Sequence, residues 1–470
     1  MLTRLEVDGF KNLLDLSIDF GAFTCIAGEN GAGKSNVFDA IQFLSLLSST
    51  SMMEAAQEVR GVHGERLGDP RDLFWKGYSE GSHRLRLAAE MIVPQEVEDD
   101  FGRPAAPTIS FLRYEIEIGY QPPLGLEKVG RLVLLKEELN HINQRDAPRH
   151  LSFPHNVGEF RNRVIFGRRS GTAFISTTYE EGEPVISIHQ DGGSRGKPRP
   201  AAASRAPATV VSTVTRSDDP TILSVKREMQ SWRRLALEPS ALRASDRYVD
   251  PREMRSDGRH LPGALYRIAA GAVGPDDAEA VYARLINRLT ELTGLDVRGL
   301  EVDADDVREL LTVHLRETSG LQLPARSLSE GTLRFLALCV LLEDPTVEGV
   351  ICMEEPENGI HPANMQAMVQ LIQDLAVDPF LAPGNDNPFR QVIINTHSPA
   401  VVQLVDQADL LFATSGRRRT PEGTLAKGLD LRPLQGTWRD EKSDGIAMTK
   451  VDILPYLTAP PGAQLVLDSA

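Results

Sequence analysis

Residues 28–35 read Gly28-Glu29-Asn30-Gly31-Ala32-Gly33-Lys34-Ser35, which fits the pattern G-x-x-x-x-G-K-[ST] of phosphate-binding loops. Glycines in this pattern let the backbone curl, so that several N–H groups point inward at phosphate oxygens. Lys34 is expected to reach the β- and γ-phosphates of a nucleotide, and the Ser35 hydroxyl is expected to ligate magnesium. The alternative is a chance glycine-rich turn, which the neighbouring sequence disfavours.

The residues on either side of this loop predict a strand before it and a helix after it. Phe23 to Ala27 is a short apolar run that ends in a glycine, as a buried strand entering a tight turn would. Val37, Ile41 and Leu44 then recur at helical spacing. A helix that begins at the loop adds the positive end of its dipole to the predicted anion site.

A second apolar run, Ile351-Cys352-Met353-Glu354-Glu355, ends in two carboxylates. Glu354 suits a water-mediated contact with magnesium, and Glu355 suits the polarisation of an attacking water. On its own the run fits an acidic strand end in solvent almost as well. The motifs around it favour the chemical interpretation.

Two further short motifs flank this run. Leu328-Ser329-Glu330-Gly331-Thr332 opens a predicted amphipathic helix, where a Ser hydroxyl and a Gly N–H make an anion site. Ser329 fits an ordinary N-cap equally well, and both roles can hold at once. Thr396-His397-Ser398-Pro399 ends a predicted strand, where His397 could hydrogen-bond a γ-phosphate. A lone histidine is more often structural, so this motif indicates a nucleotide site only in combination with the other motifs.

Together these motifs resemble the ABC-ATPase head shared by RecF, SMC and OLD-like proteins, over residues 1–140 and 310–415. The sequence LEVDGFKN at residues 5–12 resembles that branch's first strand, and NGAGKSNVFDAI resembles its Walker A helix. LSEGT resembles the signature loop, ICMEEPE the Walker B strand, and THSP the switch-histidine loop. Asn358 to Pro362 occupies the D-loop place. The nearest branch is the bacterial OLD-like ATPases, in which EEPE, GIHP and NTHSP are typical.

The resemblance implies ATP and Mg2+ as cofactors, with Glu355 and His397 as catalytic residues and Ser35 and Glu354 at the metal. It implies nucleotide contacts from two sets of residues, one around the loop and one from the signature motif of a second copy. These are Lys11, Asn12, Gly28, Asn30, Gly31, Gly33, Lys34, Ser35, Asn36, Ser329 and Gly331.

Three departures from the family pattern stand out. Glu354 replaces the usual Walker B aspartate. No Q-loop glutamine can be placed, since Gln57 and Gln95 are both weak candidates. No long heptad run is present, so an SMC-like coiled-coil arm is not expected.

The predicted fold class is α/β: a P-loop NTPase head of the ABC type in two lobes, an antiparallel β subdomain and a parallel-sheet core, with an inserted mixed or helical domain. The expected boundaries are an N-lobe at 1–140, the insert at 141–309, a C-lobe at 310–415 and a C-terminal α/β extension at 416–470. Residues 190–220 are rich in Gly, Pro, Ser and Arg and predict a loop. Weak strand signals continue to Gln464–Leu467.

Overall composition indicates in which compartment, and with which kinds of partner, the protein is expected to act. The formal net charge is −15, which argues against a surface that coats itself with nucleic acid. The three cysteines are scattered in apolar runs, without disulfide or zinc spacing, so a reducing cytoplasm is expected. The longest apolar stretch, near residues 335–342, is too short to span a bilayer, so no membrane partner is expected.

The resemblance implies a homodimer with two ATP sites, each split across the interface and opened by hydrolysis. The stretch after His397 is too short for the Toprim nuclease of OLD proteins, so a nuclease or toxin effector is expected on a separate polypeptide. Such a switch would act in antiphage defence or the DNA-damage response. The alternatives are a RecF-like DNA-binding repair ATPase and an assembly scaffold with little turnover.

Two weaker sequence signals concern DNA and guanine nucleotides. Candidate DNA-backbone contacts are Arg161, Arg163, Arg168, Arg169, Arg195, Lys197, Arg199 and Arg205. A solvated loop is the simpler interpretation of the last four. Thr449-Lys450-Val451-Asp452 resembles a guanine-reading motif of GTPases, and we interpret it as a coincidence.

Overall fold

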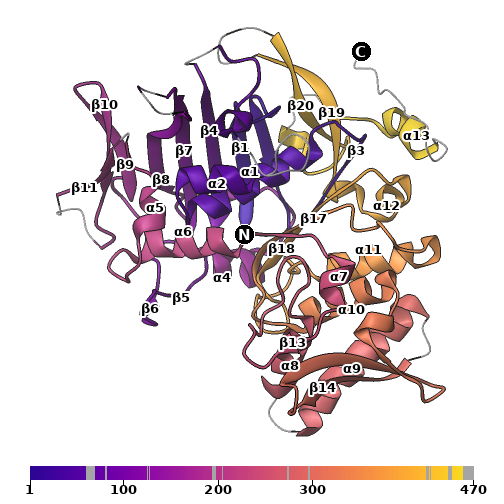
Figure 1. Cartoon of the computed structure of the whole chain (residues 1–470). Coiled ribbons are helices and arrows are strands. Elements are labelled where there is room, and N and C mark those ends of the chain that lie inside the picture. Colours follow the sequence, from indigo (N-terminus) through magenta and orange to yellow (C-terminus); the bar gives the residue numbers. More distant parts are fainter. Residues whose placement is uncertain are drawn as a thin grey trace.

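The computed structural model describes residues 1–59, 69–79, 82–123, 125, 128–192, 197–203, 205–271, 275–294, 297–419, 423, 425–442 and 447–458. An antiparallel β lobe and an α/β lobe lie side by side, and the chain's N-terminus lies between them (Figure 1). The arrangement is the predicted α/β class, with an antiparallel subdomain beside a parallel-sheet core.

The antiparallel lobe is built on an eight-stranded sheet with the order β11-β10-β9-β8-β7-β4-β1-β2. Alternating apolar residues bury one face of its strands, as the period of two in the sequence predicts. The strands are β1 (Leu2–Asp8), β2 (Leu16–Asp19), β4 (Arg84–Ile92), β7 (Phe111–Gln121), β8 (Arg131–His141), β9 (Ile175–Glu180), β10 (Glu183–Ile188) and β11 (Arg199–Ala203). A small ladder joins β5 (Val97–Glu98) to β6 (Pro104–Ala105).

The α/β lobe is built on a six-stranded sheet with the order β12-β17-β18-β3-β19-β20. The first five strands are mutually parallel, and β20 returns antiparallel to β19. They are β12 (Arg233–Leu235), β17 (Gly349–Glu354), β18 (Arg390–Thr396), β3 (Phe23–Gly28), β19 (Leu410–Arg419) and β20 (Leu425–Pro433). Both faces of β3, β17 and β18 are buried, which explains their uninterrupted apolar runs.

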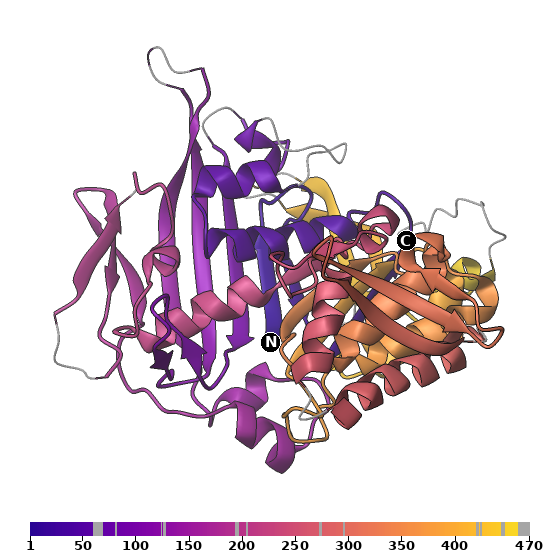
Figure 2. The same ribbon diagram turned by 60° about the horizontal axis from the view of Figure 1, so that its bottom comes forward.

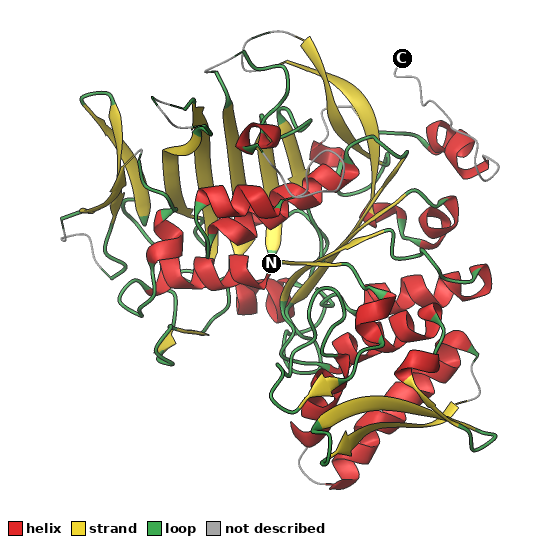
Figure 3. Ribbon diagram, in the orientation of Figure 1, coloured by secondary structure: helices red, strands yellow, loops and turns green. Residues whose placement is uncertain are grey.

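Helices form the layers on both sides of the parallel sheet. α1 packs in one core with the antiparallel sheet and with one face of the parallel sheet, while α10 and α11 pack in a second core on the other face. Figure 3 shows α1, α2 and α6 in front of the antiparallel sheet. The helices are α1 (Lys34–Leu47), α2 (Met52–Glu58), α3 (Ala147–His150), α4 (Asn162–Val164), α5 (Val210–Thr213), α6 (Pro220–Ser231), α7 (Pro239–Leu242), α8 (Leu261–Gly271), α9 (Pro275–Thr293), α10 (Glu330–Glu343), α11 (Met365–Asp374), α12 (Pro399–Leu404) and α13 (Lys450–Thr458).

A small antiparallel sheet completes the α/β lobe, and Figure 2 shows it on the outer side of that lobe. It has the order β13-β15-β14, and β16 pairs with β15. Its strands are β13 (Asp246–Arg247), β14 (Val297–Asp305), β15 (Leu310–Glu317) and β16 (Gln322–Pro324).

The boundaries predicted for the insert differ from the structure. Residues 141–309 do not form one unit: β9, β10 and β11 extend the antiparallel sheet, while β12 joins the parallel sheet. The boundary at 309 falls inside the small sheet, between β14 and β15, and the boundary at 415 falls inside β19. The boundaries between the lobes depend on backbone pairing between segments that are distant in the sequence. Local composition does not predict that pairing.

The loop predicted at residues 190–220 is also partly wrong, because it contains β11 and α5. β11 is an edge strand paired only with β10, and an edge position tolerates Pro200. The strand signals at Gln464–Leu467 lie outside the described residues.

Candidate functional site

The glycines of the loop at residues 28–35 hold backbone conformations that side chains would prevent. Gly28, Gly31 and Gly33 have φ angles of 148°, 80° and 102°. A Cβ on Gly33 would lie 2.1 Å from the Asn12 Nδ2, and a Cβ on Gly28 would lie 2.6 Å from the Ala413 oxygen. A Cβ on Gly31 would meet nothing within 4 Å. The loop is therefore tightly supported at Gly28 and Gly33 and open at Gly31.

A cavity of about 520 Å3 lies over this loop. It brings together predicted residues that are far apart in the sequence: Lys11, Asn12, Asn30, Gly31, Gly33, Lys34, Ser35, Asn36 and Glu355. Six more residues line it that the sequence analysis did not single out: Asp39, Asp72, Phe74, Trp75, Lys76 and Asn395. The cavity lies where the carboxyl ends of β3, β17 and β18 meet, because parallel strands end at one edge of a sheet.

Lys34 folds back onto the loop itself. Its Nζ donates to the Gly28 oxygen at 2.6 Å and to the Glu29 oxygen at 2.8 Å. Burial lowers the pKa of Lys34 below its ordinary value, and the charge of Glu355 partly opposes this shift. These two carbonyls hold the ammonium at the base of the cavity.

Asn12 ties the loop to α1 and to β20. Its Nδ2 donates to the Ala32 oxygen at 3.2 Å, and its Oδ1 accepts from the Asn36 Nδ2 at 2.7 Å. The backbone N–H of Leu429, on β20, donates to the Asn12 oxygen at 3.1 Å. Residues from three distant segments thus brace the same turn.

Glu355 is held from both sides of its carboxylate. The His397 Nδ1 lies 2.7 Å from Oε1, and the Asn358 Nδ2 donates to Oε2 at 2.9 Å. The residue has a φ of 44°, a left-handed conformation that is uncommon outside glycine. Its backbone N–H donates to the Asn395 oxygen at 2.9 Å. The side chain is therefore fixed in direction where Glu355 lines the cavity.

Glu354 belongs to a chain of four charged side chains. The Arg234 Nη2 lies 3.1 Å from the Glu354 Oε1, and its Nη1 lies 3.3 Å from the Asp39 Oδ1. The Lys11 Nζ lies 2.8 Å from the other Asp39 oxygen. Asp39 sits one turn after Ser35 on α1, so these four charged side chains connect α1 to the end of β17.

The donors present fit a magnesium ion. The Ser35 hydroxyl and the Glu354 carboxylate are hard oxygen ligands of the kind this ion prefers. The first lies in the cavity at the start of α1. The second ends β17, is not among the residues that line the cavity, and faces a cation, Arg234. These two residues are the ones that would hold the ion.

Ser329 and Gly331 do not line the cavity of their own chain. Ser329 is the N-cap of α10, and its Oγ accepts from the Thr332 N–H at 3.1 Å. It is exposed, and Gly331 lies beside Gly359 of the turn that follows β17. The signature motif and this turn therefore form one surface of the α/β lobe.

A buried acid links that turn to the histidine loop. Glu357 accepts a hydrogen bond from the Thr396 hydroxyl, and the Ser398 N–H donates to the same hydroxyl at 2.9 Å. Glu357 is 7% exposed, and burial raises its pKa. The segment that positions His397 is thus fastened to the segment that follows Glu355.

Three contributions to the site escaped the sequence analysis. Trp75 and Lys76 follow a 3-10 turn, Pro70–Leu73, and reach the cavity because the Trp75 N–H donates to the Gly9 oxygen at 2.9 Å. Arg234 lies in a short strand with no periodic pattern. The only signal for Trp75 was a tryptophan in a polar segment, flanked by Lys76 and glycine.

Neither weak Q-loop candidate lines the cavity: the Gln95 Nε2 donates to the Arg163 oxygen at 2.6 Å, and Gln57 is exposed on α2. The motif at residues 449–452 has a local role. The Thr449 N–H and hydroxyl both bond the Asp452 carboxylate, at 2.7 and 2.8 Å, and cap α13. Its interpretation as a coincidental match to a guanine motif fits this role.

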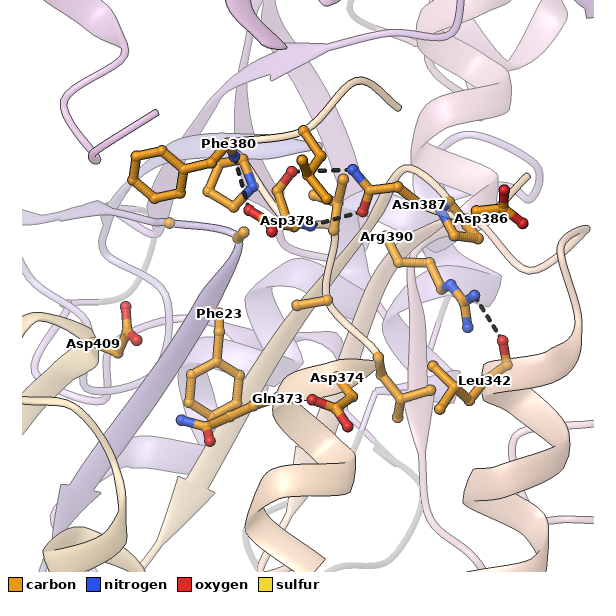
Figure 4. A pocket seen from close by; sticks show the side chains of 18 of the residues that line it. Phe23, Leu342, Gln373, Asp374, Asp378, Phe380, Asp386, Asn387, Arg390 and Asp409 are labelled. Atoms are coloured by element: carbon orange, nitrogen blue, oxygen red, sulfur yellow. Dashed lines mark hydrogen bonds between the residues drawn. The ribbon is translucent and has the colours of Figure 1, made fainter. Parts of the chain in front are cut away.

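A larger cavity lies elsewhere. It measures about 1190 Å3 and opens at the opposite ends of β3 and β18, where Phe23 and Arg390 begin those strands. Figure 4 shows Arg390 bonded to the Leu342 oxygen there, with Asp378 and Asn387 in the neighbouring loop. None of the predicted site residues lines it. Its size therefore does not mark the site of the chemistry.

Several basic residues that were candidate DNA contacts form interactions with other residues of the same chain. Arg169 packs 3.9 Å over the Phe174 ring and donates to three backbone oxygens. Arg199 pairs with Asp219, and Arg163 pairs with Glu159. Arg195 lies outside the described residues.

A phosphate-binding loop beside a carboxylate and histidine pair, on a parallel sheet flanked by an antiparallel lobe, is the arrangement of an ABC-type P-loop ATPase domain of the RecF and SMC branch. The comparison with protein families agrees. The profile described as "AAA domain, putative AbiEii toxin, Type IV TA system" matches residues 23–403, and the chain belongs to this family.

Curated relatives match only short segments. RecF of Bacteroides thetaiotaomicron is 38% identical over 84 residues, which are 16% of this chain and 23% of that protein. The chromosome partition protein Smc of Bacillus subtilis is 34% identical over 102 residues, 21% of this chain and 7% of that protein. The chain therefore spans less than a quarter of either relative.

Solved SMC heads align along most of the chain at low identity. The SmcHead bound to the C-winged helix domain of ScpA is 14% identical, with 93% of this chain and 98% of that chain covered and a TM-score of 0.46. The SMC head domain from Thermotoga maritima is 13% identical, with 92% and 99% covered and a TM-score of 0.35. Within the described ranges, no helix combines the length and apolar character needed to cross a bilayer.

Proposed function

We propose that this chain binds ATP with Mg2+ in the cavity over residues 28–35 and hydrolyses it with Glu355 as the group that activates water. The observation that carries this proposal is the Glu355 carboxylate, which lines the same cavity as Lys34 and lies 2.7 Å from the His397 Nδ1. A general base must lie within reach of the water it polarises and be oriented by a neighbour.

Each residue has a definite task in this proposal. The loop N–H groups and Lys34 bind the phosphates, for which the ammonium leaves the two carbonyls it now contacts. Magnesium, when bound at Ser35 and Glu354, neutralises charge on the phosphate oxygens. Glu355 orients the attacking water and accepts its proton, while His397 and Asn358 hold the carboxylate in place.

The second half of the proposal is a homodimer. Ser329 and Gly331 lie outside the cavity of their own chain, and Ser329 is exposed at the start of α10. An exposed helix start suits a phosphate brought by a second copy. Two heads would then close around two ATP molecules and separate after hydrolysis, as a switch driven by contacts to the γ-phosphate.

The Glu355→Gln variant tests both halves. It keeps the size of the side chain and removes the base, so it should bind ATP, lose at least about a hundredfold in turnover and elute as a closed dimer only with ATP and Mg2+. Glu159→Gln is a matched control, because Glu159 is an exposed carboxylate that pairs with Arg163 and does not line the cavity. A Glu355→Gln protein that stays monomeric with ATP and still hydrolyses it contradicts the assignment.

The switch is proposed to control a separately encoded nuclease or toxin in antiphage defence or the DNA-damage response. The family description, which names a type IV toxin–antitoxin system, supports a toxin setting. Co-expression with each neighbouring gene tests this directly: a toxic effect should depend on Lys34 and Glu355 of this chain. Toxicity unaffected by Lys34→Ala would argue for an assembly scaffold in which turnover plays no part.

One observation favours a second candidate function, DNA binding in the manner of a RecF-like repair ATPase. Arg417 and Lys427 lie directly opposite each other on β19 and β20, and both are exposed. Like charges at this position repel, and no ion pair to either is found among the described residues. Charge-reversing both residues should abolish binding of duplex DNA at low salt. Binding that survives the change would remove this candidate site.

A further inference from the structure

Asn395 lines the cavity over residues 28–35 and carries a buried amide donor without a partner among the described residues. It is the next-to-last residue of β18, in register with Glu354 on one side and Ile26 on the other. It is 2% exposed, and the cavity that it lines is the one over Lys34. Its Nδ2 has no hydrogen-bond partner within the part of the chain that the structure describes.

The orientation of this amide is fixed by its other end. The Oδ1 accepts from the Glu355 N–H at 3.3 Å, and a backbone N–H can only donate. The oxygen must therefore face Glu355, which leaves the Nδ2 as the group that faces elsewhere. Reversing the amide would place two donors against each other.

A buried donor without a partner costs free energy, and native proteins keep few of them. Such groups that persist in a cavity call for an acceptor that arrives with a ligand. The ligand here must bring an oxygen acceptor to the part of the cavity lined by Lys34 and Glu355, whose charges interact. In a nucleotide bound by this type of loop, that part receives the terminal phosphate, since the loop lysine reaches the β- and γ-phosphates.

We infer that the Asn395 Nδ2 donates to the γ-phosphate of bound ATP and so allows the site to distinguish ATP from ADP. The inference rests on the proposed ATP site and adds a residue to it. Asn395 also accepts the Glu355 N–H, through both its side chain and its backbone oxygen. A phosphate that bonds Nδ2 is therefore connected through one residue to the backbone of the water-activating carboxylate.

Binding of AMP-PNP and of ADP, each with Mg2+, tests this by calorimetry on the full chain. Asn395→Asp keeps the size and the oxygen that faces Glu355, but replaces the donor by an acceptor. It should weaken AMP-PNP binding by about a hundredfold and ADP binding by less than about threefold. Asn395→Ala removes the donor without adding charge, and should weaken AMP-PNP binding by about tenfold. Thermal unfolding of the nucleotide-free variants reports any general damage.

The outcomes distinguish a failure of the proposed ATP site from a failure of the proposed role of Asn395. If the unmodified protein binds neither nucleotide, the proposed ATP site falls and this inference falls with it. If it binds both and the Asn395 variants keep its preference for AMP-PNP over ADP, the inference alone is overturned. Equal weakening of both nucleotides also overturns it, because the loss of a γ-phosphate donor should weaken AMP-PNP binding far more than ADP binding.

Discussion

Arg234 pairs with Glu354, its Nη2 lying 3.1 Å from the carboxylate Oε1. The same guanidinium contacts Asp39 on α1, so one cation bridges the two elements that should hold the metal. It is 18% exposed, and its charge is therefore only partly screened by solvent. Arg234 neutralises Glu354 in the nucleotide-free head and opposes the binding of a divalent cation there.

Arg234→Ala should accordingly strengthen binding of Mn2+ to the nucleotide-free protein. We expect about tenfold, or roughly 1.4 kcal/mol, because removing one nearby positive charge lowers the repulsion felt by the ion. Electron paramagnetic resonance of added Mn2+ measures the free fraction directly. Arg234→Lys should keep the low affinity, and Arg227→Ala, which breaks a distant pair with Asp100, should have no effect. An unchanged Mn2+ affinity in Arg234→Ala would show that the pair is only structural.

Trp75 should report nucleotide binding. Its ring is half-buried at the cavity and its backbone is anchored to Gly9, so a purine can stack on it. Stacking of a base on an aromatic side chain contributes about 1–3 kcal/mol, so Trp75→Ala should weaken ATP binding about tenfold or more. ATP should also quench tryptophan fluorescence in Trp438→Phe and leave it unchanged in Trp75→Phe. Quenching that persists without Trp75 would place the base elsewhere.

Two alanine substitutions separate backbone strain from steric conflict in the loop. Gly31 and Gly33 both have positive φ, but only at Gly33 does the added Cβ meet another residue, Asn12, at 2.1 Å. Gly31→Ala should cost about 1 kcal/mol from strain alone, while Gly33→Ala should cost at least about 2 kcal/mol and detach Asn12. Urea unfolding without nucleotide measures both. Equal losses would contradict the close packing described between Gly33 and Asn12.

Several of the residues singled out in the sequence line one cavity because the information that places them is local. Loop, helix start and strand end are each encoded within a few residues, as at Gly33 and Ser35 or at Glu354 and Glu355. Parallel strands then bring such ends together without further information. Trp75 and Asn395 reach the cavity, and Arg234 reaches Asp39 beside it, through long-range pairing that local sequence patterns do not encode.

The domain boundaries failed for the same physical reason. β9 to β11 look like any isolated hairpin in sequence, and only the pairing of Leu139 with Ile175 assigns them to the antiparallel sheet. β12 has three residues, and its parallel pairing with β17 depends on a partner more than a hundred positions away. Composition predicted a separate insert where tertiary contacts divide the segment between the two lobes.

Glu137 should make stability depend on pH. It is fully buried on β8, and burial raises its pKa to about 7 even though the Val210 and Val211 N–H groups bond its carboxylate. The folded chain therefore holds a proton that the unfolded chain, with a pKa of 4.5, has lost. This contribution is fully present below pH 4.5, falls as the pH rises and is lost above about pH 7, up to about 3 kcal/mol in all.

Urea unfolding of the unmodified chain and of Glu137→Gln at pH 5, 6, 7 and 8 checks this dependence. The variant has no proton to lose, so its unfolding free energy should change less over this range, whatever its absolute stability. Glu138→Gln is the matched control, because the neighbouring carboxylate is only partly buried on the same strand. The same slope in Glu137→Gln as in the unmodified protein would locate the titrating group elsewhere.

A mixing experiment tests the split ATP site most directly. Lys34→Ala disables the loop of a chain, and Ser329→Arg blocks the signature surface that the chain offers to its partner, so neither variant alone should hydrolyse ATP. In a mixed dimer one of the two sites keeps an intact Lys34 from one chain and an intact Ser329 from the other. Equal mixing should therefore restore about a quarter of the unmodified ATPase rate. A mixture as inactive as its components would contradict the shared site.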